Sequence, residues 1–372
     1  MKIKKIEILH LRIPLKRKFK HSLMERKFTD NIILRIYSES NFGIGECVPR
    51  EYVTGENPYS VLKNLKEIII PKFTNKKFNN KEEIFKEIKL FLKTIKKNEL
   101  SAFACFEDAL INLVAKEFKF KMKDILNYLN IKFKKKKSIE YSAIIDDTNI
   151  VQTIIKALII KKRKFNSVKI KVNPDSSKKL YIIRQILKNQ KLRVDANCSF
   201  NIKNINKFID TLKELNISKF EQPYKTTDKN KNIMDELCKM KGIEIIYDES
   251  ACTLNEIKNL NSSIQLRISK NGGIINSLQI YEYLEEKNIN VYLGCMVGET
   301  ILTKENIIFG EYLDFIETEG DYDKYLFEKK ITKNPNFNKK GILKYQNIDI
   351  DQNFKINNNY LKYILCESTL EF

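Results

Sequence analysis

At 372 residues the chain is long enough for a barrel of about 250 residues together with a second domain. Hydrophobic residues make up 42% of it, which excludes an intrinsically disordered protein. The net charge of +21 raises the question of nucleic-acid binding. We expect no nucleic-acid partner, because the basic residues are spread along the chain and the densest run, 134–137, has the character of a solvated loop.

The seven cysteines indicate a reducing compartment. Their number is odd and no CxxC motif occurs, so we expect reduced thiols in a cytoplasmic protein. The basic N-terminus is not followed by the apolar segment of a signal peptide. No window holds 18 consecutive apolar residues, so we predict no membrane span.

The first third of the chain predicts an α+β domain over residues 1–125. Alternating residues in 3–13, 31–38 and 42–47 predict three antiparallel strands, with polar loops at 16–26 and 50–57. Helical spacing follows in 61–69, 82–95 and 101–115, and the last of these helices is small, apolar and predicted to be buried.

The rest of the chain alternates short apolar runs with helical segments, which predicts a (β/α)8-type TIM barrel over residues 126–325. We expect its first strand at 139–145, its seventh at 291–295 and its eighth at 315–317. Residues 326–372 are predicted to be a C-terminal segment that packs back on the first domain.

Charged residues end five successive apolar runs, 22 to 27 residues apart, which is close to one βα unit each. These residues are Lys169 and Lys171, Asp195, Glu221, Asp248 and Lys270. In such a barrel the carboxyl ends of the strands carry the active site. Three unrelated acids paired with abundant lysines are the plainer interpretation, but the regular spacing favours one site.

Three carboxylates without histidine favour a hard cation such as Mg²⁺ over zinc, since the only histidines are His10 and His21 in the first domain. A lysine serves as a general base when burial or a nearby cation lowers its pKa. Lys171 and Lys270 come from strands on opposite sides of the barrel. Two such bases could remove a proton from one face of a carbon and return it to the other, which is racemisation or epimerisation.

The order Lys-x-Lys, Asp-Ala-Asn, Glu-Gln-Pro, Asp-Glu-Ser and Ser-Lys-x-Gly-Gly resembles the muconate-lactonizing subgroup of the enolase superfamily. The segment Gly43–Glu46 and the helix 101–115 resemble the capping domain of that family. The resemblance implies Mg²⁺ bound by Asp195, Glu221 and Asp248, with Lys171 and Lys270 as the acid/base pair. It further implies that Lys169 lends charge to the substrate carboxylate and that Asn197 contacts these groups without binding the metal.

The resemblance also implies that the loops 16–26 and 50–57, the second with Tyr52, close over the substrate. The sequence departs from the family pattern in two places. The acid of the seventh-strand motif, Glu299, stands one place late. Dipeptide epimerases carry Asp-x-Asp at the eighth strand to hold an ammonium group, whereas this chain has Glu317, Glu319, Asp321 and Asp323. A solvated acidic loop is the alternative interpretation of that cluster.

The prediction is therefore a Mg²⁺-dependent isomerase of amino-acid derivatives, with dipeptide epimerase as the best single hypothesis. A lyase or cycloisomerase of the same superfamily, of the o-succinylbenzoate synthase or muconate cycloisomerase type, is the alternative. The partner is a small carboxylate substrate. The sequence leaves its side chains, and assembly into a homo-oligomer, open.

Overall fold

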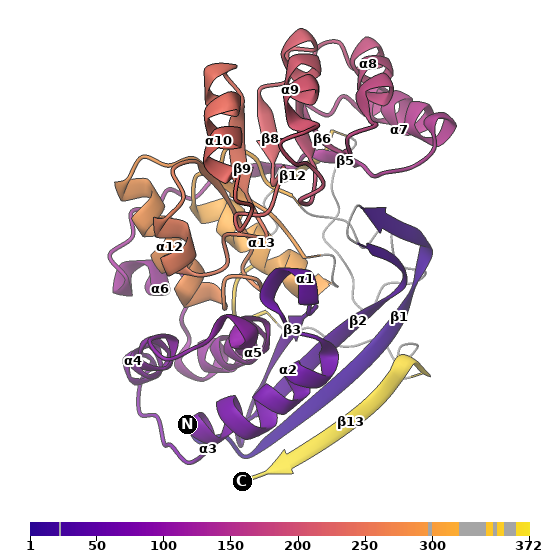
Figure 1. Cartoon of the computed structure of the whole chain (residues 1–372). Helices are drawn as coiled ribbons and strands as arrows, with labels where there is room; N and C mark the ends of the chain where they lie inside the picture. The colour runs from indigo at the N-terminus through magenta and orange to yellow at the C-terminus, as the bar shows by residue number, and fades with distance from the viewer. Residues whose placement is uncertain (22–23, 297–299, 320–339, 345–347, 353–361) are drawn as a thin grey trace.

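The computed structural model describes residues 1–21, 24–296, 300–319, 340–344, 348–352 and 362–372. An antiparallel sheet and its helices form one part of the molecule, and a curled parallel sheet surrounded by helices forms the other (Figure 1). None of the helices in these ranges is both long enough and apolar enough to cross a membrane.

The antiparallel sheet has the strand order β13-β1-β2-β3. Its strands are β1 (Lys5–His21), β2 (Met24–Tyr37), β3 (Phe42–Cys47) and β13 (Ile364–Glu371). Because β13 pairs along β1 from Lys5 to Leu11, both ends of the chain lie on the same sheet (Figure 1). The predicted domain boundaries stay predictions: residue 125 lies within a helix, and residue 325 lies outside the described residues.

The loop predicted at 16–26 is wrong, because β1 and β2 continue as a hairpin through it. Phe19 pairs with Arg26 and Lys20 with Glu25, beyond a register shift after Pro14. Backbone hydrogen bonds extend a hairpin whatever its side chains are, and the basic sequence of 16–26 lacks the regular alternation of apolar and polar residues that predicts a strand. The loop predicted at 50–57 instead contains a short helix over Glu51–Thr54.

Helices pack on one face of this sheet (Figure 1). They are α1 (Glu51–Thr54), α2 (Pro58–Asn64), the π-helix Leu65–Ile69, α3 (Ile70–Thr74), α4 (Lys81–Leu92), the 3₁₀ turn Lys97–Glu99, α5 (Leu100–Phe118) and α6 (Met122–Tyr128). The predicted burial of 101–115 is confirmed, since every residue of α5 from Leu100 to Ala115 is buried.

Glycine allows α5 to lie directly against β3. A Cβ added to Gly45 would come within 2.1 Å of the Cys105 carbonyl oxygen, and one added to Gly43 within 2.0 Å of the Ala109 carbonyl oxygen. Both obstacles are backbone atoms, which cannot rotate away. The close approach of strand and helix therefore requires glycine at both positions.

We expect Gly45→Ala to lower the free energy of unfolding by about 3 kcal/mol or more, because β3 and α5 must separate. Urea denaturation measures this. Gly242→Ala is the matched control. Gly242 has a positive φ of 71°, but nothing lies within 4 Å of the added carbon, so this variant should lower the free energy of unfolding by only about 1 kcal/mol. Equal losses for the two variants would refute the packing argument.

The parallel sheet has the order β11-β10-β9-β8-β7-β6-β5, with consecutive strands as neighbours. Its strands are β5 (Ala143–Ile145), β6 (Ser167–Lys171), β7 (Lys191–Asp195), β8 (Lys219–Glu221), β9 (Glu244–Tyr247), β10 (Ser263–Leu266) and β11 (Val291–Leu293). Thr318 forms parallel bridges with both Tyr141 and Leu293, so it joins the two edges of the sheet. Among the described residues, the eighth strand predicted at 315–317 is represented only by these isolated β-bridges of Thr318.

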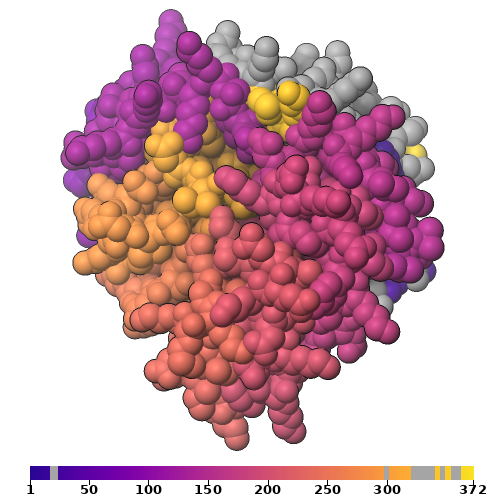
Figure 2. Space-filling view, turned by 90° about the horizontal axis from the view of Figure 1, so that it is seen from above, coloured from indigo at the N-terminus to yellow at the C-terminus, as the bar shows by residue number. Residues whose placement is uncertain are grey.

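Each strand is followed by a helix, as predicted for a barrel. The helices are α7 (Ile150–Arg163), α8 (Ser177–Ile186), α9 (Ile205–Glu214), α10 (Lys231–Met240), α11 (Leu254–Lys258), α12 (Ile274–Glu286) and α13 (Thr300–Tyr312). Seen from above, the colours follow one another around the molecule in chain order (Figure 2). The architecture is a TIM-barrel-like α/β fold with an N-terminal antiparallel sheet.

The predicted first strand, 139–145, is divided in two. β4 (Ser138–Glu140) pairs antiparallel with β12 (Ile342–Lys344), and only β5 joins the barrel.

Candidate active site

Three carboxylates stand at the carboxyl ends of neighbouring barrel strands. Asp195 and Glu221 are the last residues of β7 and β8, where they pair in register, and Asp248 directly follows β9. All three are at most 1% exposed. Short strands in register bring residues from three βα units to one edge of the sheet, as the sequence predicted.

Lys169 and Lys171 point to the same side of β6, into the barrel. The Lys169 Nζ lies 2.9 Å from Asp195 Oδ2, 2.9 Å from Glu221 Oε1 and 2.7 Å from Glu319 Oε1. Burial lowers the pKa of Lys169, but the three carboxylates outweigh it and raise the pKa well above its usual range. Lys169 is therefore a permanent cation below the ends of the strands.

Lys171 lies one step nearer the mouth than Lys169. Its Nζ donates to Asp195 Oδ2 at 2.6 Å and to Asn197 Oδ1 at 2.8 Å. The Asn197 side chain in turn donates to Glu249 Oε1 at 2.7 Å. Asn197 thus connects Lys171 to the loop after β9, and it contacts Asp195 through its backbone N–H.

Lys270 lies in the turn between β10 and α12 and is fully buried. It donates to the backbone oxygens of Asp248 and Gln265, both at 2.7 Å, and its Nζ lies 3.2 Å from Asp248 Oδ1. Lys171 therefore touches the first carboxylate of the series, and Lys270 touches the third.

The turn that carries Lys270 is held from the capping domain. Glu107 of α5 accepts hydrogen bonds from the backbone N–H groups of Ile274 and Ile275 at the start of α12. Gly273 has a φ of 100°, and a Cβ there would come within 1.9 Å of Glu107 Oε2. Burial raises the pKa of Glu107 to about 8, although the two N–H groups oppose this shift. The first domain thus helps to place a residue of the barrel site.

Sequence reasoning missed two arginines inside the barrel. Arg193 is fully buried, and it binds Glu221 Oε2 at 2.8 Å and also Glu319. Arg267 contacts Asp248, and its NH2 group lies 3.8 Å from Glu221 Oε1. The period-two alternation of strands could have found both, since Arg193 shares a strand face with Asp195 and Arg267 follows the buried Gln265 by two residues.

The all-oxygen donor set of the three carboxylates suits a hard cation. Burial and the neighbouring Asp195 raise the pKa of Glu221 to about 8 despite Lys169 and Arg193, so negative charge is crowded there. Within the described ranges no three acidic, histidine or cysteine side chains converge on one point. Lys169 and Arg267 lie between the carboxylates instead.

Of the acids predicted for substrate binding, Glu317 and Glu319 meet at one guanidinium. The Arg193 Nε lies 3.1 Å from Glu317 Oε2, and the NH2 group of Arg193 contacts Glu319. Glu319 is 2% exposed and binds Lys169 and Arg193 within the barrel, with a pKa near 2 because these cations and Arg267 outweigh its burial. Glu317 accepts from Ser142, before β5, and lies 3.4 Å from Lys219 at the start of β8, so it lies at the amino end of the barrel. Glu299, Asp321 and Asp323 lie outside the described residues.

Tyr52 lies in α1 and is half-buried in a cluster with Val53, Leu100 and Cys252. Cys252 follows the Asp248-Glu249-Ser250 segment, so α1 touches the loop that leaves β9. This places the 50–57 segment beside the barrel, while a contact of Tyr52 with substrate stays a prediction.

We expect Glu319→Gln to destabilise the protein by about 3 kcal/mol, because it leaves Lys169 and Arg193 with one anion fewer in a buried site. Chemical denaturation tests this, with Glu67→Gln as control, because Glu67 is 63% exposed and pairs only with the similarly exposed Lys63 among the ion pairs of the described residues. A loss no larger than that of the Glu67 variant would show that Glu319 is not a structural counter-ion.

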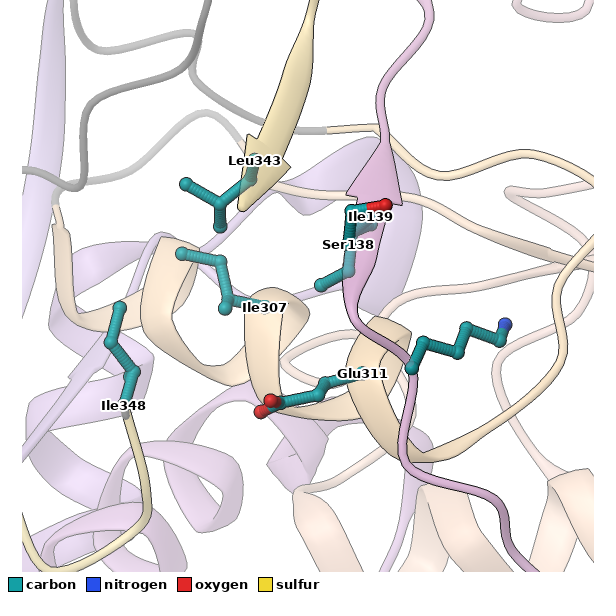
Figure 3. Close-up of a pocket in the computed structure, with 7 residues that line it drawn as sticks. Ser138, Ile139, Ile307, Glu311, Leu343 and Ile348 are labelled. Carbon is teal, nitrogen blue, oxygen red and sulfur yellow. The ribbon is translucent and has the colours of Figure 1, made fainter. Parts of the chain in front are cut away.

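A separate pocket lies between α13 and the β4–β12 pair (Figure 3). Its lining residues are Lys136, Ser138, Ile139, Ile307, Glu311, Leu343 and Ile348. Glu311 is 2% exposed, and neither carboxylate oxygen has a hydrogen-bond partner among the described residues. Burial and Asp349 raise the pKa of Glu311 to about 7, opposed by Lys135.

A raised carboxyl pKa stabilises the fold at low pH, and that contribution is lost as the pH rises through about 7. We expect Glu311→Gln to be more stable than the natural protein at pH 8 by about 1–3 kcal/mol and to lose this advantage near pH 5. Denaturation curves from pH 5 to 9 measure the difference. Glu67→Gln, on an exposed helix, is the control, and parallel curves for Glu311→Gln and the natural protein would contradict the prediction.

Comparison with known proteins places this barrel in a family. Residues 154–342, just over half of the chain, match the family model described as "Enolase C-terminal domain-like". The chain belongs to this family, and the resemblance to the enolase superfamily predicted from its motifs is confirmed.

Three relatives indicate the kinds of protein to which the chain is similar. It is 24% identical over 297 residues to the L-Ala-D/L-Glu epimerase of Francisella tularensis subsp. novicida (strain U112), and the aligned residues cover 77% of this chain and 80% of the relative. It is 25% identical over 328 residues to the o-succinylbenzoate synthase of Bacillus subtilis (strain 168), covering 85% and 84%. The dipeptide epimerase of Cytophaga hutchinsonii, solved with Mg and the dipeptide D-Ala-L-Val, superposes with a TM-score of 0.81 over 99% of this chain and 100% of that one, at 22% identity.

Proposed function

We propose that the protein is a Mg²⁺-dependent racemase or epimerase that removes the proton α to a substrate carboxylate. One observation carries the proposal. Two buried lysines from opposite sides of the barrel, Lys171 and Lys270, contact the first and the third of three neighbouring carboxylates. The named relatives support the reaction class, because epimerases are among them.

Asp195, Glu221 and Asp248 would hold the metal, as their all-oxygen donor set suits Mg²⁺. When bound, Mg²⁺ supplies a Lewis acid that lowers the pKa of the α-proton of a coordinated carboxylate. Lys169 stays protonated below the ligands and balances their charge. Asn197 keeps the Lys171 ammonium group directed toward Asp195.

In this mechanism one lysine takes the α-proton from one face of the substrate, and the other lysine delivers a proton to the opposite face. The lysine that acts as base must be neutral at the moment of transfer, and an added divalent cation favours the neutral form by repulsion. The two lysines exchange roles in the reverse direction, so the enzyme interconverts both configurations at that carbon. The barrel buries both amines, which limits their access to water.

A dipeptide is the best single hypothesis for the substrate. The epimerases among the relatives support it. The eighth-strand acids support it less than the sequence suggested, since Glu319 pairs with Lys169 and Arg193, and Glu317 pairs with Arg193 and Lys219.

That pairing of Glu319 favours, as a second candidate, a substrate without an ammonium group. A lyase of the o-succinylbenzoate synthase type would use the same metal ligands with only one lysine as base. The similarity to the B. subtilis synthase supports it. Loss of water from the substrate without inversion at the α-carbon would favour this candidate.

We further propose that the protein acts in the cytoplasm on a small molecule. All seven cysteines are free thiols, which suits a reducing compartment. Assembly into a homo-oligomer is left to measurement of the mass in solution.

Incubation in D2O with Mg²⁺ tests the reaction class. We expect deuterium to enter the α-position of at least one member of a library of acidic, cationic and apolar dipeptides and N-acylated amino acids, detected by mass spectrometry. Absence of exchange across the library, together with dehydration of a hydroxylated carboxylate, would replace the epimerase with the lyase.

A further inference from the structure

Five carboxylates and five cations fill the mouth and middle of the barrel among the described residues. The carboxylates are Asp195, Glu221, Asp248, Glu249 and Glu319, and the cations are Lys169, Lys171, Arg193, Arg267 and Lys270. Arg193 also pairs with Glu317, which in turn pairs with Lys219. A divalent cation adds two positive charges to the same space, which favours either the movement of an existing cation or the loss of a proton from a lysine.

Arg267 and Lys171 are the most exposed of these five cations. Their side chains are 12% and 10% exposed, against 2% for Lys169 and none for Arg193 and Lys270. The Nε of Arg267 is buried without a hydrogen-bond partner among the described residues, so the guanidinium is incompletely held. A long and partly satisfied side chain near the mouth is the one that can move at least cost.

The structure also makes room for this arginine. Gly294, which directly follows β11, faces both Gln265 and Arg267: a Cβ there would come within 2.3 Å of Gln265 Nε2 and within 3.0 Å of the Cγ and the Nε of Arg267. The guanidinium reaches Asp248 Oδ2 and lies 3.8 Å from Glu221 Oε1. It thus occupies the space between two of the three proposed metal ligands.

We propose that Arg267 is an internal counter-ion that occupies Glu221 and Asp248 in the metal-free protein and is displaced from them when a divalent cation binds. This inference rests on the proposed metal site. Arg267 keeps two buried carboxylates together while the site is empty, and its departure is part of the cost of binding the metal. It is a positioning residue, which lowers metal affinity and stabilises the metal-free fold.

The test is calorimetric titration of metal-stripped protein with MgCl2, which needs no substrate. We expect Arg267→Met to bind Mg²⁺ about tenfold more tightly than the natural protein and Arg267→Lys to lie between them. The melting temperature of metal-free Arg267→Met should fall, and its rise on addition of Mg²⁺ should exceed that of the natural protein. Lys219→Met is the matched control, because it removes a cation from the amino end of the barrel, and its Mg²⁺ affinity should be unchanged.

Equal or weaker Mg²⁺ binding by Arg267→Met, in protein whose circular dichroism matches that of the natural chain, would overturn the inference and leave the metal site intact. If neither the natural protein nor the variant binds Mg²⁺, the inference and the metal site of the proposed function both fail. Mn²⁺, followed by its electron paramagnetic resonance, gives a second reading of the same competition.

Discussion

Replacing Lys171 or Lys270 by alanine should abolish racemisation, with a loss of at least about 10³-fold in kcat. General acid–base catalysis by a positioned group contributes about 10²–10⁴-fold, and here each direction of the reaction needs both lysines. Each variant should still exchange the α-proton of the one configuration that its remaining lysine faces. Nuclear magnetic resonance in D2O, starting from each pure configuration, measures exchange and inversion separately.

Lys219→Met is the control for the lysine variants, since Lys219 pairs with Glu317 at the amino end of the barrel. This variant should leave the rates of α-proton exchange and of inversion unchanged. If Lys171→Ala or Lys270→Ala leaves exchange from both configurations as it was, the two-base mechanism is wrong. If only one of the two lysines matters for exchange and no inversion occurs in the natural protein, the single-base lyase is the better description.

Removal of the metal should lower the reaction rate as much as loss of either lysine. We expect chelation by EDTA to slow α-proton exchange by about 10³-fold or more, and we expect added Mg²⁺ to restore the rate. The α-proton of a free carboxylate is very weakly acidic, and removing the Lewis acid loses several kcal/mol of stabilisation of the deprotonated substrate. Asp248→Asn should weaken Mg²⁺ binding in calorimetry and lower kcat in parallel.

Glu67→Gln, at a side chain that is 63% exposed in the π-helix Leu65–Ile69, is the control for the metal-ligand variant and should bind Mg²⁺ normally. Exchange that continues at full rate in EDTA would exclude a metal from the reaction. Loss of Mg²⁺ binding in Asp248→Asn without loss of activity would place the functional metal elsewhere.

The sequence by itself determined the strand-end charges and their order. Asp195, Glu221 and Asp248 each close a short apolar run, and the constant spacing of a βα unit forces such residues to one edge of the sheet. The two-residue period of β6 likewise required Lys169 and Lys171 to share a face. These features follow from local chain geometry, which is why they could be read without coordinates.

The tertiary structure alone decided which charges meet. The sequence does not show that Glu319 reaches Lys169, 150 residues away, or that Glu317 and Glu319, two residues apart, both pair with Arg193. The reason is the stagger between neighbouring strands, which sets the height of each side chain and depends on the closed barrel as a whole. Arg267, which lies between Glu221 and Asp248, also packs closely against Gly294 after β11, a contact between residues that no local pattern links.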